Sequence, residues 1–592
     1  MFHKPKRISS LFALGAIGLA GLMLLVPVAA LPATNPEQVK FTLKSDVGDS
    51  TAIDVDLSFK MSGGEKAIIK PSKQTEQVAA SGAAPSFELL SQSNPSFAVE
   101  PLSAPDAGWT VTAASDGVIK FSYKVKFAGN SGSATDSGNA QTTGEAPGGV
   151  LPPRAIVEQD LKAFSGSDAL LAPQNQSGQY LSEEFGVIVQ KASGESVLAP
   201  WSTASDGSFE IGSSEELLSN FLAWGKMTKV TLQPGGPTIT AGFAGDVNMS
   251  DSSRSAYGNA IMKIHDEIER VMGQRPDEAQ ATVLVTGAAR YGVRQPASES
   301  LRDSFLLFHG ASTLKGPASA AASRGWFDLW NGVSLVASSR GDAAWMQDGL
   351  PWFYGYRVAS TLGMLDANAA YLQFSGVYAD YLTDPSALKT SLATAQKNGG
   401  AGRLLAAKGA ALSASMSVKL AKEATSGGKN IEWLLGQMAK QFNHLEGKDY
   451  AVANVSEILE KATATSWDSF FAGRVGSADV IEASEFSTTD VFGTGGVVGG
   501  PQKLSGKGSG KNWIYLVIAI LIIFSIPIIF SAYIRRAVRL DMTMPSILPD
   551  FDEDEEQATP AEQPSAVTPI GDGGDEEGLG GNEKDGGDSE AD

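Results

Sequence analysis

The sequence predicts an α+β protein, with a β-rich N-terminal domain followed by a mostly helical domain, a single transmembrane helix and a disordered tail. Three observations support this fold class. Apolar and polar residues alternate in the N-terminal part, the apolar spacing changes to three and four residues after Asp251, and an uncharged apolar run lies near the C-terminus. Of the 592 residues, 42% are apolar and 19% are charged, as is typical of a folded chain.

Residues 1–30 are predicted to be a secretory signal peptide. Lys4, Lys6 and Arg7 precede an apolar run from Leu11 to Ala30 that ends in small residues. This run is also long enough to remain as a membrane anchor, so its cleavage stays open. In both cases the segment that follows is expected to be exported.

Residues 34–245 are predicted to form the β-rich N-terminal domain. Apolar residues alternate with polar ones from Ile53 to Phe59 and again from Ile119 to Phe127, so one face of each strand is expected to be buried. The stretch Gly129–Gly149 is rich in small residues and has no periodicity. We expect it to be a flexible loop inserted in this domain.

Residues 246–485 are predicted to form a mostly helical, thermolysin-like domain. The first helix is marked by apolar residues at helical spacing: Tyr257, Ile261, Ile264, Ile268 and Val271. A strand is expected at Thr282–Thr286, and later helices at Ile431–Phe442 and Val455–Thr463. Residues 486–512 are dominated by Gly, Ser and Thr, which predicts a flexible stalk.

Residues 513–534 are predicted to cross a membrane, because they carry no charge and would span about 30 Å of hydrocarbon as a helix. Arg535, Arg536 and Arg539 follow at once, which places the C-terminus in the cytoplasm by the positive-inside rule. We therefore expect a single-pass plasma membrane protein with an extracytoplasmic N-terminal ectodomain.

Residues 535–592 are predicted to be an acidic, disordered cytoplasmic tail. The formal net charge of the chain is −20, and residues 541–592 contain 17 acidic residues against one lysine. Such a segment cannot bury enough apolar surface to offset its ordering entropy. Two roles stay open for it, a simple solvated tail or a docking segment for a basic cytoplasmic partner.

The composition excludes several classes of function. There is no cysteine, so disulfides, thiolate nucleophiles and cysteine-ligated zinc are ruled out. The four histidines are His3, His265, His309 and His444. His265 lacks the second histidine that a zinc helix needs, because Glu269 stands at that position. The exported region has no basic cluster, so nucleic acid is not an expected partner.

Three motifs follow one another in the helical domain, namely Phe308–Thr313, Gly325–Asn331 and Trp345–Pro351. In this order they resemble the Glu-His-x-x-Ser-Thr stretch, the HExxH-x-Trp-Asn helix and the Trp-x-x-Glu-Gly segment of the glycyl aminopeptidase-type metallopeptidases, which form family 61 of the thermolysin-like gluzincins. The resemblance implies the same order of a β-domain and a thermolysin-like domain.

The resemblance also implies a metal site that has lost its chemistry. A zinc hydrolase of this kind needs two imidazoles one helical turn apart, a later carboxylate, and a glutamate beside the first imidazole as general base. The degenerate metal-site positions are Arg324, Gly325, Asp328 and Asp348, so we expect no catalytic residue, no metal and no cofactor. Arg324 is instead expected to pair with both carboxylates. The residues expected in the inherited cleft are His309, Trp330, Asn331 and Tyr354.

These features favour a membrane-anchored pseudoenzyme of bacterial origin, with a catalytically inactive metallopeptidase-like ectodomain that binds peptides or proteins or acts as a scaffold. Two alternatives remain at this point. The first is an active membrane-bound aminopeptidase-like metallopeptidase with a non-standard metal site. The second is a structural surface protein that signals through its acidic tail.

Overall fold

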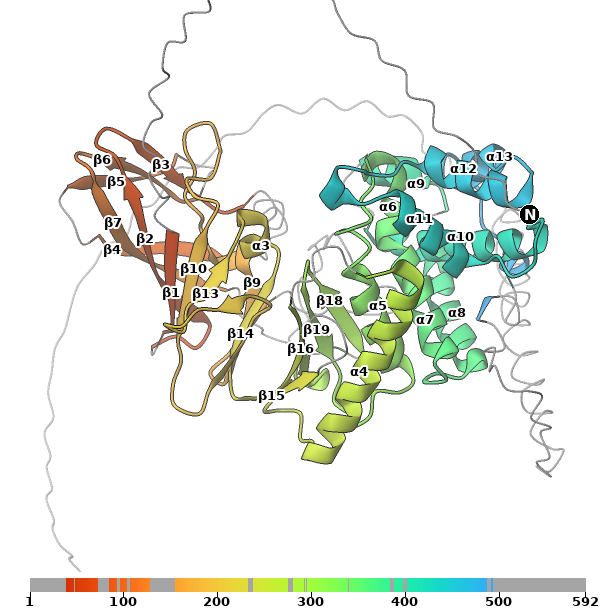
Figure 1. Cartoon of the computed structure of the whole chain (residues 1–592), viewed down its shortest axis with the longest axis horizontal. Helices are drawn as coiled ribbons and strands as arrows, with labels where there is room; N and C mark the ends of the chain where they lie inside the picture. The colour runs from red at the N-terminus through yellow and green to blue at the C-terminus, as the bar shows by residue number, and fades with distance from the viewer. Residues whose placement is uncertain are drawn as a thin grey trace, which may run out of the picture. The chain divides into compact units, whose positions relative to one another are not determined.

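The computed structural model describes residues 39–492, apart from longer gaps at 73–84 and 128–154 and several shorter ones (Figure 1). The expected signal peptide, the Gly129–Gly149 loop, the membrane span and the acidic tail therefore lie outside the described residues. Among the residues that the structure describes, no helix is both long enough and apolar enough to cross a membrane.

The N-terminal domain is built from three antiparallel or mixed sheets, as the alternating sequence predicts. The largest sheet has the order β12 (Ser202–Thr203), β13 (Phe209–Ile211), β10 (Phe185–Gln190), β1 (Val39–Ser45), β2 (Ala52–Met61), β7 (Gly117–Lys126) and β4 (Ser86–Gln92). Ile53, Val55 and Leu57 of β2 are buried, while the polar residues between them are partly exposed. The predicted alternation is therefore confirmed in this strand.

Two smaller sheets complete this domain. One has the order β3 (Lys66–Ile69), β6 (Trp109–Ala113) and β5 (Phe97–Pro101), and the other has the order β11 (Ser196–Leu198), β14 (Phe221–Gly225), β9 (Leu161–Ser165) and β8 (Ile156–Val157). Two short helices, α2 (Gly166–Ala169) and α3 (Ser214–Leu218), lie between strands.

A five-stranded sheet forms the base of the second domain. Its order is β15 (Met227–Leu232), β16 (Ile239–Ala244), β17 (Ala281–Thr286), β19 (Ser304–Phe308) and β18 (Ala297–Ser300). The strand expected at Thr282–Thr286 is β17. Since β16 pairs in parallel with β17, both β15 and β16 belong to this sheet, and the domain begins before the boundary expected at residue 245.

Helices pack around this sheet and continue beyond it. They are α4 (Asp251–Met272), α5 (Pro317–Asp328), α6 (Arg340–Asp348), α7 (Leu350–Thr361), α8 (Ala367–Thr383), α9 (Leu392–Lys397), α10 (Gly402–Glu423), α11 (Ile431–Gln441), α12 (Val452–Thr463) and α13 (Asp468–Arg474). Short 3-10 turns lie at Ala289–Tyr291, His444–Glu446 and Ala483–Glu485. The helices expected near 257–271, 431–442 and 455–463 are α4, α11 and α12.

The folded domain extends beyond the boundary expected at residue 485. Val491 and Phe492 are buried, with 0% and 1% of their surface exposed, inside the segment assigned to the stalk. The Phe492 ring packs against Phe353 and Phe374, and the Phe492 carbonyl accepts a hydrogen bond from Ser360 Oγ at 3.3 Å. The Gly-rich composition around this pair concealed two anchoring residues, because two apolar positions are too few to show a period.

Candidate functional site

Helix α5 carries the degenerate metal-site positions. It begins at Pro317, where the missing N–H of proline costs nothing, and Arg324 and Asp328 lie one turn apart on it. Helix α7 crosses α5 at Gly355, where a Cβ atom would lie 2.7 Å from the Ala320 carbonyl oxygen. Only glycine permits this approach, and in Figure 1 the two helices lie side by side.

The Arg324 guanidinium is anchored to the edge strand β18 and to α7. Its Nε donates to Ser298 Oγ at 3.2 Å and its Nη2 donates to the Ser298 carbonyl at 2.7 Å. Its Cζ lies 3.8 Å from the centroid of the Trp352 ring, and only 8% of the residue is exposed. The expected bidentate pairing with Asp328 and Asp348 is therefore replaced by a clamp between Ser298 and Trp352.

The Asp328 carboxyl is the most perturbed acid of this site. Its pKa is raised to about 8, mainly by burial; Arg324 and a hydrogen bond from Ser300 oppose the shift, and the negative charges of Glu299 and Asp348 add to it. A carboxyl with such a pKa is mostly protonated at neutral pH. In the absence of a bound cation, Asp328 therefore carries little negative charge.

Gly325 stands at the position of the general base, and the surrounding core leaves no space for a side chain there. A Cβ atom on Gly325 would lie 2.7 Å from Cδ2 and 3.0 Å from Cε2 of Phe305 in β19. Phe305 is 1% exposed, and its ring packs edge-on against Trp326 at 5.3 Å between centroids. The sheet therefore occupies the volume that a glutamate would need.

Asp348 is placed by the end of α6. Asn331 Nδ2 donates to the carbonyls of Met346 at 3.2 Å and Gln347 at 3.1 Å, which ties the last turn of α6 to the chain that follows α5. The next residue, Gly349, approaches α10 so closely that a Cβ atom would lie 2.5 Å from Cα of Gly409. Asp348 itself is partly buried.

The four residues expected in a cleft are all buried in the packed domain. His309 Nδ1 bonds to the Tyr257 hydroxyl at 2.9 Å, and burial lowers the pKa of the His309 imidazole. Trp330 Nε1 donates to the Gly273 carbonyl at 3.2 Å. Tyr354 is fully buried, and its hydroxyl has no hydrogen-bond partner among the described residues. Asn331, which bonds to the end of α6, is buried as well. These four side chains therefore pack inside the domain and do not line an open cleft.

The sequence alone did not reveal the residues that close this site, namely Ser298, Glu299, Ser300, Phe305 and Trp352. The strand β18 is only four residues long and carries no clear alternation. Its place at the sheet edge, beside α5, follows from its antiparallel pairing with β19. The two strands form a hairpin, but nothing in their sequence indicates that its edge lies beside α5.

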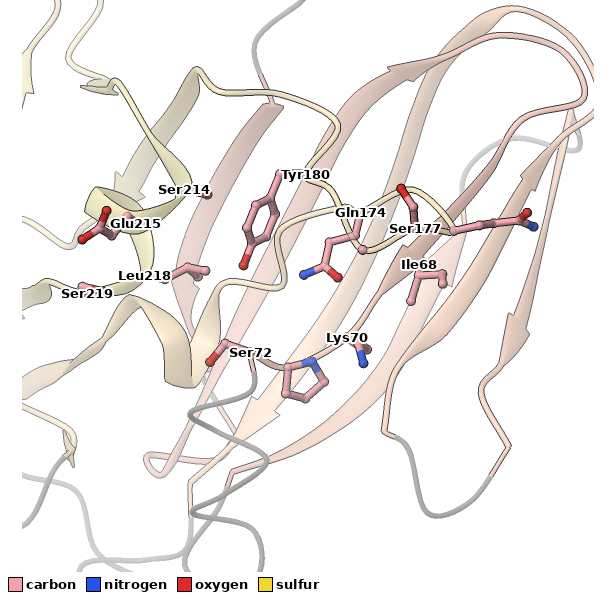
Figure 2. Close-up of a pocket in the computed structure, with 13 residues that line it drawn as sticks. Ile68, Lys70, Ser72, Gln174, Ser177, Tyr180, Ser214, Glu215, Leu218 and Ser219 are labelled. Atoms are coloured by element: carbon pink, nitrogen blue, oxygen red, sulfur yellow. The ribbon is translucent and has the colours of Figure 1, made fainter. Parts of the chain in front are cut away.

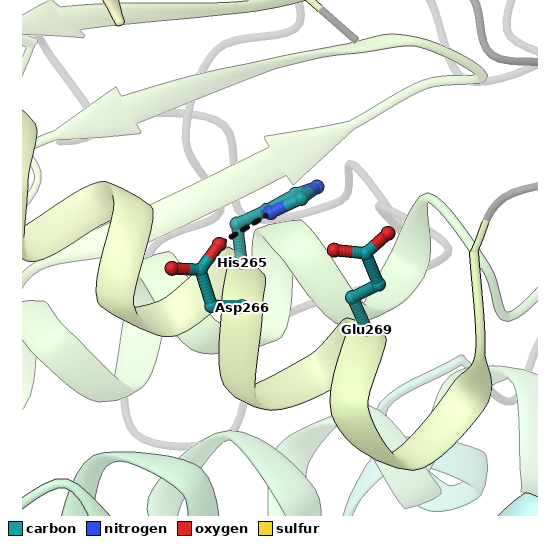
Figure 3. A group of neighbouring side chains, drawn as sticks. All are labelled: His265, Asp266 and Glu269. Atoms are coloured by element: carbon teal, nitrogen blue, oxygen red, sulfur yellow. Dashed lines mark hydrogen bonds and ion pairs between the residues drawn. The ribbon is translucent and has the colours of Figure 1, made fainter. Parts of the chain in front are cut away.

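A second group of polar side chains lies on α4, on the side where His265 packs against Trp326 of α5. Figure 3 shows His265, Asp266 and Glu269, which each offer one ligand atom within 4.8 Å of the others. The sequence pattern excluded His265 as a zinc ligand because no second histidine follows at the right spacing. Helical geometry nevertheless brings two carboxylates to this histidine, at positions i+1 and i+4.

A cavity of about 690 Å³ lies in the N-terminal domain, where loop and helix residues converge (Figure 2). Its polar lining includes Gln174, Ser177 and Tyr180 on one side and Ser214 and Glu215 of α3 on the other. Burial raises the pKa of Tyr180, and a hydrogen bond with Gln174 opposes this shift. Its amide and hydroxyl groups both donate and accept hydrogen bonds, and Lys70 and Glu215 add one charge of each sign, so this lining suits a polar ligand surface.

Comparison with solved structures supports a peptidase-like fold. An aminopeptidase N family protein from Idiomarina loihiensis aligns with a TM-score of 0.55 at 13% identity, over 75% of this chain and 77% of that one. An M1 zinc metallopeptidase from Deinococcus radiodurans, crystallised with a Tyr-Ser-Ala substrate, aligns with a TM-score of 0.45 at 12% identity, over 75% and 94% of the two chains.

No protein-family model matches the sequence. No curated protein sequence matches it either. At 13% identity, the alignment with the Idiomarina loihiensis protein shows a shared fold and nothing about activity. It supports the peptidase-like fold expected from the sequence, while the closer assignment to the glycyl aminopeptidase type stays a prediction.

Proposed function

We propose that this chain is a membrane-anchored extracytoplasmic protein whose M1-like ectodomain has no zinc peptidase activity and binds peptides or proteins. One observation supports the proposed loss of activity. Arg324, held by Ser298 and Trp352, stands at the position expected for the first imidazole. Gly325, which packs against Phe305, stands at the position expected for the general base.

The residue chemistry supports the loss of zinc hydrolysis. A guanidinium has five N–H donors and no acceptor, so Arg324 has no lone pair to offer a metal. No carboxylate can stand at position 325 to activate water without displacing Phe305. Asp328, the third altered position on α5, holds a proton at neutral pH because its pKa is raised to about 8.

The proposed binding role relies on surfaces that have kept suitable chemistry. The cavity beside Tyr180 and Gln174 offers amide and hydroxyl groups, which match the alternating N–H and C=O groups of a peptide main chain. Anchoring relies on the sequence of residues 513–534, which lie outside the described residues. The acidic tail and its basic partner likewise stay predictions from sequence.

A reconstruction experiment tests the proposed inactivity. The wild-type protein should hydrolyse no member of a peptide library with or without added Zn²⁺. The variant Arg324→His/Gly325→Glu/Asp328→His should also fail to gain activity, because Phe305 occupies the space of the new glutamate. Zinc-dependent hydrolysis by the wild-type protein would contradict the proposal and would favour an active peptidase.

The binding role needs a separate measurement. Immobilised full-length protein should retain peptides from the same library, and Tyr180→Ala with Gln174→Ala should weaken that retention if the N-terminal cavity is the binding surface. Exposed Leu372→Ala, on α8, is a matched control that should not change it. Complete absence of peptide retention would contradict this part of the proposal.

A further inference from the structure

We propose that His265, Asp266 and Glu269 form a binding site for a divalent first-row transition metal ion such as Zn²⁺ on α4. The three residues follow the spacing i, i+1 and i+4. Residue i+4 is a neighbour of both others on a helix surface, so all three side chains can meet above the same turn. The ligand atoms lie within 4.8 Å of one another (Figure 3).

The distances are close to those that a bound ion requires. Ligands held at about 2.1 Å from a tetrahedral ion lie roughly 3.4 Å apart. His265 Nδ1 and Asp266 Oδ1 are already 3.2 Å apart. The Glu269 carboxylate needs only a side-chain rotation to join them, and it has no hydrogen-bond or ion-pair partner in the part of the chain that the structure describes.

The imidazole is held in place by packing. His265 is 4% exposed, and its ring lies 5.2 Å from the Trp326 ring and 5.7 Å from the Trp330 ring, measured between centroids. These contacts fix the ring plane, so little conformational entropy remains to be lost on metal binding. The Asp266 side chain is 60% exposed, which leaves the remaining coordination positions open to water.

The local charge also favours a cation. Arg270 lies four residues after Asp266, at a spacing that allows an ion pair on a helix. Its Nε and Nη2 instead donate to Glu267 at 2.9 and 2.7 Å. The two carboxylates of the site are therefore not compensated by this arginine. Glu269 also lies in the last turn of α4, where the partial negative charge of the helix end attracts cations.

The ligand set defines the class of metal. An imidazole with two carboxylates suits Zn²⁺ and its neighbours, whereas Mg²⁺ and Ca²⁺ prefer oxygen ligands alone. Trp326, which contacts His265, follows Arg324 by two residues and so lies about 200° around α5 from it. The ion would therefore bind behind α5, away from the positions that carry zinc chemistry in the related fold, and we expect it to confer no hydrolysis.

The experiment is a Zn²⁺ titration of the full chain by calorimetry, with metal content measured after dialysis. The wild-type protein should bind one Zn²⁺ at this site and melt at a higher temperature with Zn²⁺ than with Mg²⁺. The variant Asp266→Asn/Glu269→Gln should bind at least about tenfold more weakly and lose the melting shift. The matched control Asp251→Asn removes an exposed carboxylate from the first turn of the same helix, leaves the Arg270–Glu267 pair intact, and should bind as the wild type does.

Three results would overturn the proposal. They are no Zn²⁺ binding by the wild type, unchanged binding by the double variant, and equal weakening by Asp251→Asn. Binding that survives the double variant but disappears in Asp328→Asn/Asp348→Asn would place the ion on the other face of α5. That last result would also contradict the proposed loss of the inherited site, so the two proposals can be separated.

Discussion

The two faces of α5 differ in how their charged groups are compensated. On the front face, Arg324 lies between Ser298 and Trp352, next to an Asp328 carboxyl whose pKa is raised to about 8. On the back face, Trp326 packs on His265, beside the carboxylates of Asp266 and Glu269, which Arg270 does not neutralise. The front face carries its own cation within the chain, while the back face is open to one from solution.

The contacts of Arg324 agree with our proposal that a zinc site is missing here, and they show how the fold would remain intact without one. Replacing an imidazole by a neutral apolar residue would leave nearby acids without a cation in a buried place, which is costly. A guanidinium supplies the positive charge permanently, and its planar group bonds to strand β18 and stacks on α7. Arg324 thereby links the edge strand of the sheet to two helices, α5 and α7.

The largest expected effect is the loss of this cross-link. Arg324→Ala should lower the free energy of unfolding by roughly 3–5 kcal/mol, because the Ser298 hydroxyl and carbonyl each lose a hydrogen bond from a charged donor and the Trp352 ring loses its stacked cation. Arg324→Lys keeps the charge but loses the paired hydrogen bonds and the stacking, so its stability should lie between those of the wild type and Arg324→Ala. Chemical denaturation of the three proteins measures this, and an unchanged stability in Arg324→Ala would show that the front face is not a cross-link.

The next effect tests the closure at Gly325. Gly325→Ala should destabilise the protein by about 1–3 kcal/mol, since the new methyl group would overlap the Phe305 ring, which is buried and cannot move freely. Combining it with Phe305→Leu should recover part of the loss. If Gly325→Ala were instead stabilising, as expected for an unhindered helical position, the front face would contain unused space.

A smaller effect concerns pH. The pKa of Asp328 is raised to about 8 in the folded protein, mainly by burial, whereas an unfolded aspartate titrates near 3.9. Between about pH 4 and pH 8 the folded state therefore keeps a proton on Asp328 that the unfolded state has released. The contribution of Asp328 to the free energy of unfolding is complete below about pH 4 and is lost as the pH rises through 8.

The resulting slope is at most about 1.4 kcal/mol per pH unit, and it should be smaller because the side chain is partly exposed. Asp328→Asn is neutral at every pH, so the variant should gain stability relative to the wild type as the pH rises from 5 to 8. Melting temperatures measured across this range test the prediction. A constant difference between the two proteins would mean that Asp328 titrates normally.

The smallest effect belongs to the back face. Without metal, Asp266→Asn/Glu269→Gln should change the free energy of unfolding by only a few tenths of a kcal/mol, in the stabilising direction, since it relieves repulsion between two charges at helical spacing. Denaturation in the presence of a chelator measures this. A large loss of stability would indicate that the carboxylates are structural, which would weaken the contrast with the front face.

The sequence by itself determined the elements whose signal is local. The period-two pattern of β2 and the helical spacing in α4, α11 and α12 are short-range properties, because each is set by the direction of neighbouring side chains. The absence of imidazoles at residues 324 and 328 is also readable directly. The periodic patterns were sufficient to expect an α+β protein, while the expectation of a peptidase-like domain without its usual zinc ligands rested on the family resemblance of three short motifs.

Only the tertiary structure decided what took their place. Ser298 meets Arg324 because β18 returns antiparallel along β19, and Phe305 closes on Gly325 because β19 lies under α5. Phe492 joins the core far from its sequence neighbours. Such contacts depend on packing between segments that are distant in sequence, and packing energies depend on shape and burial in three dimensions, which leave no periodic signal along the chain.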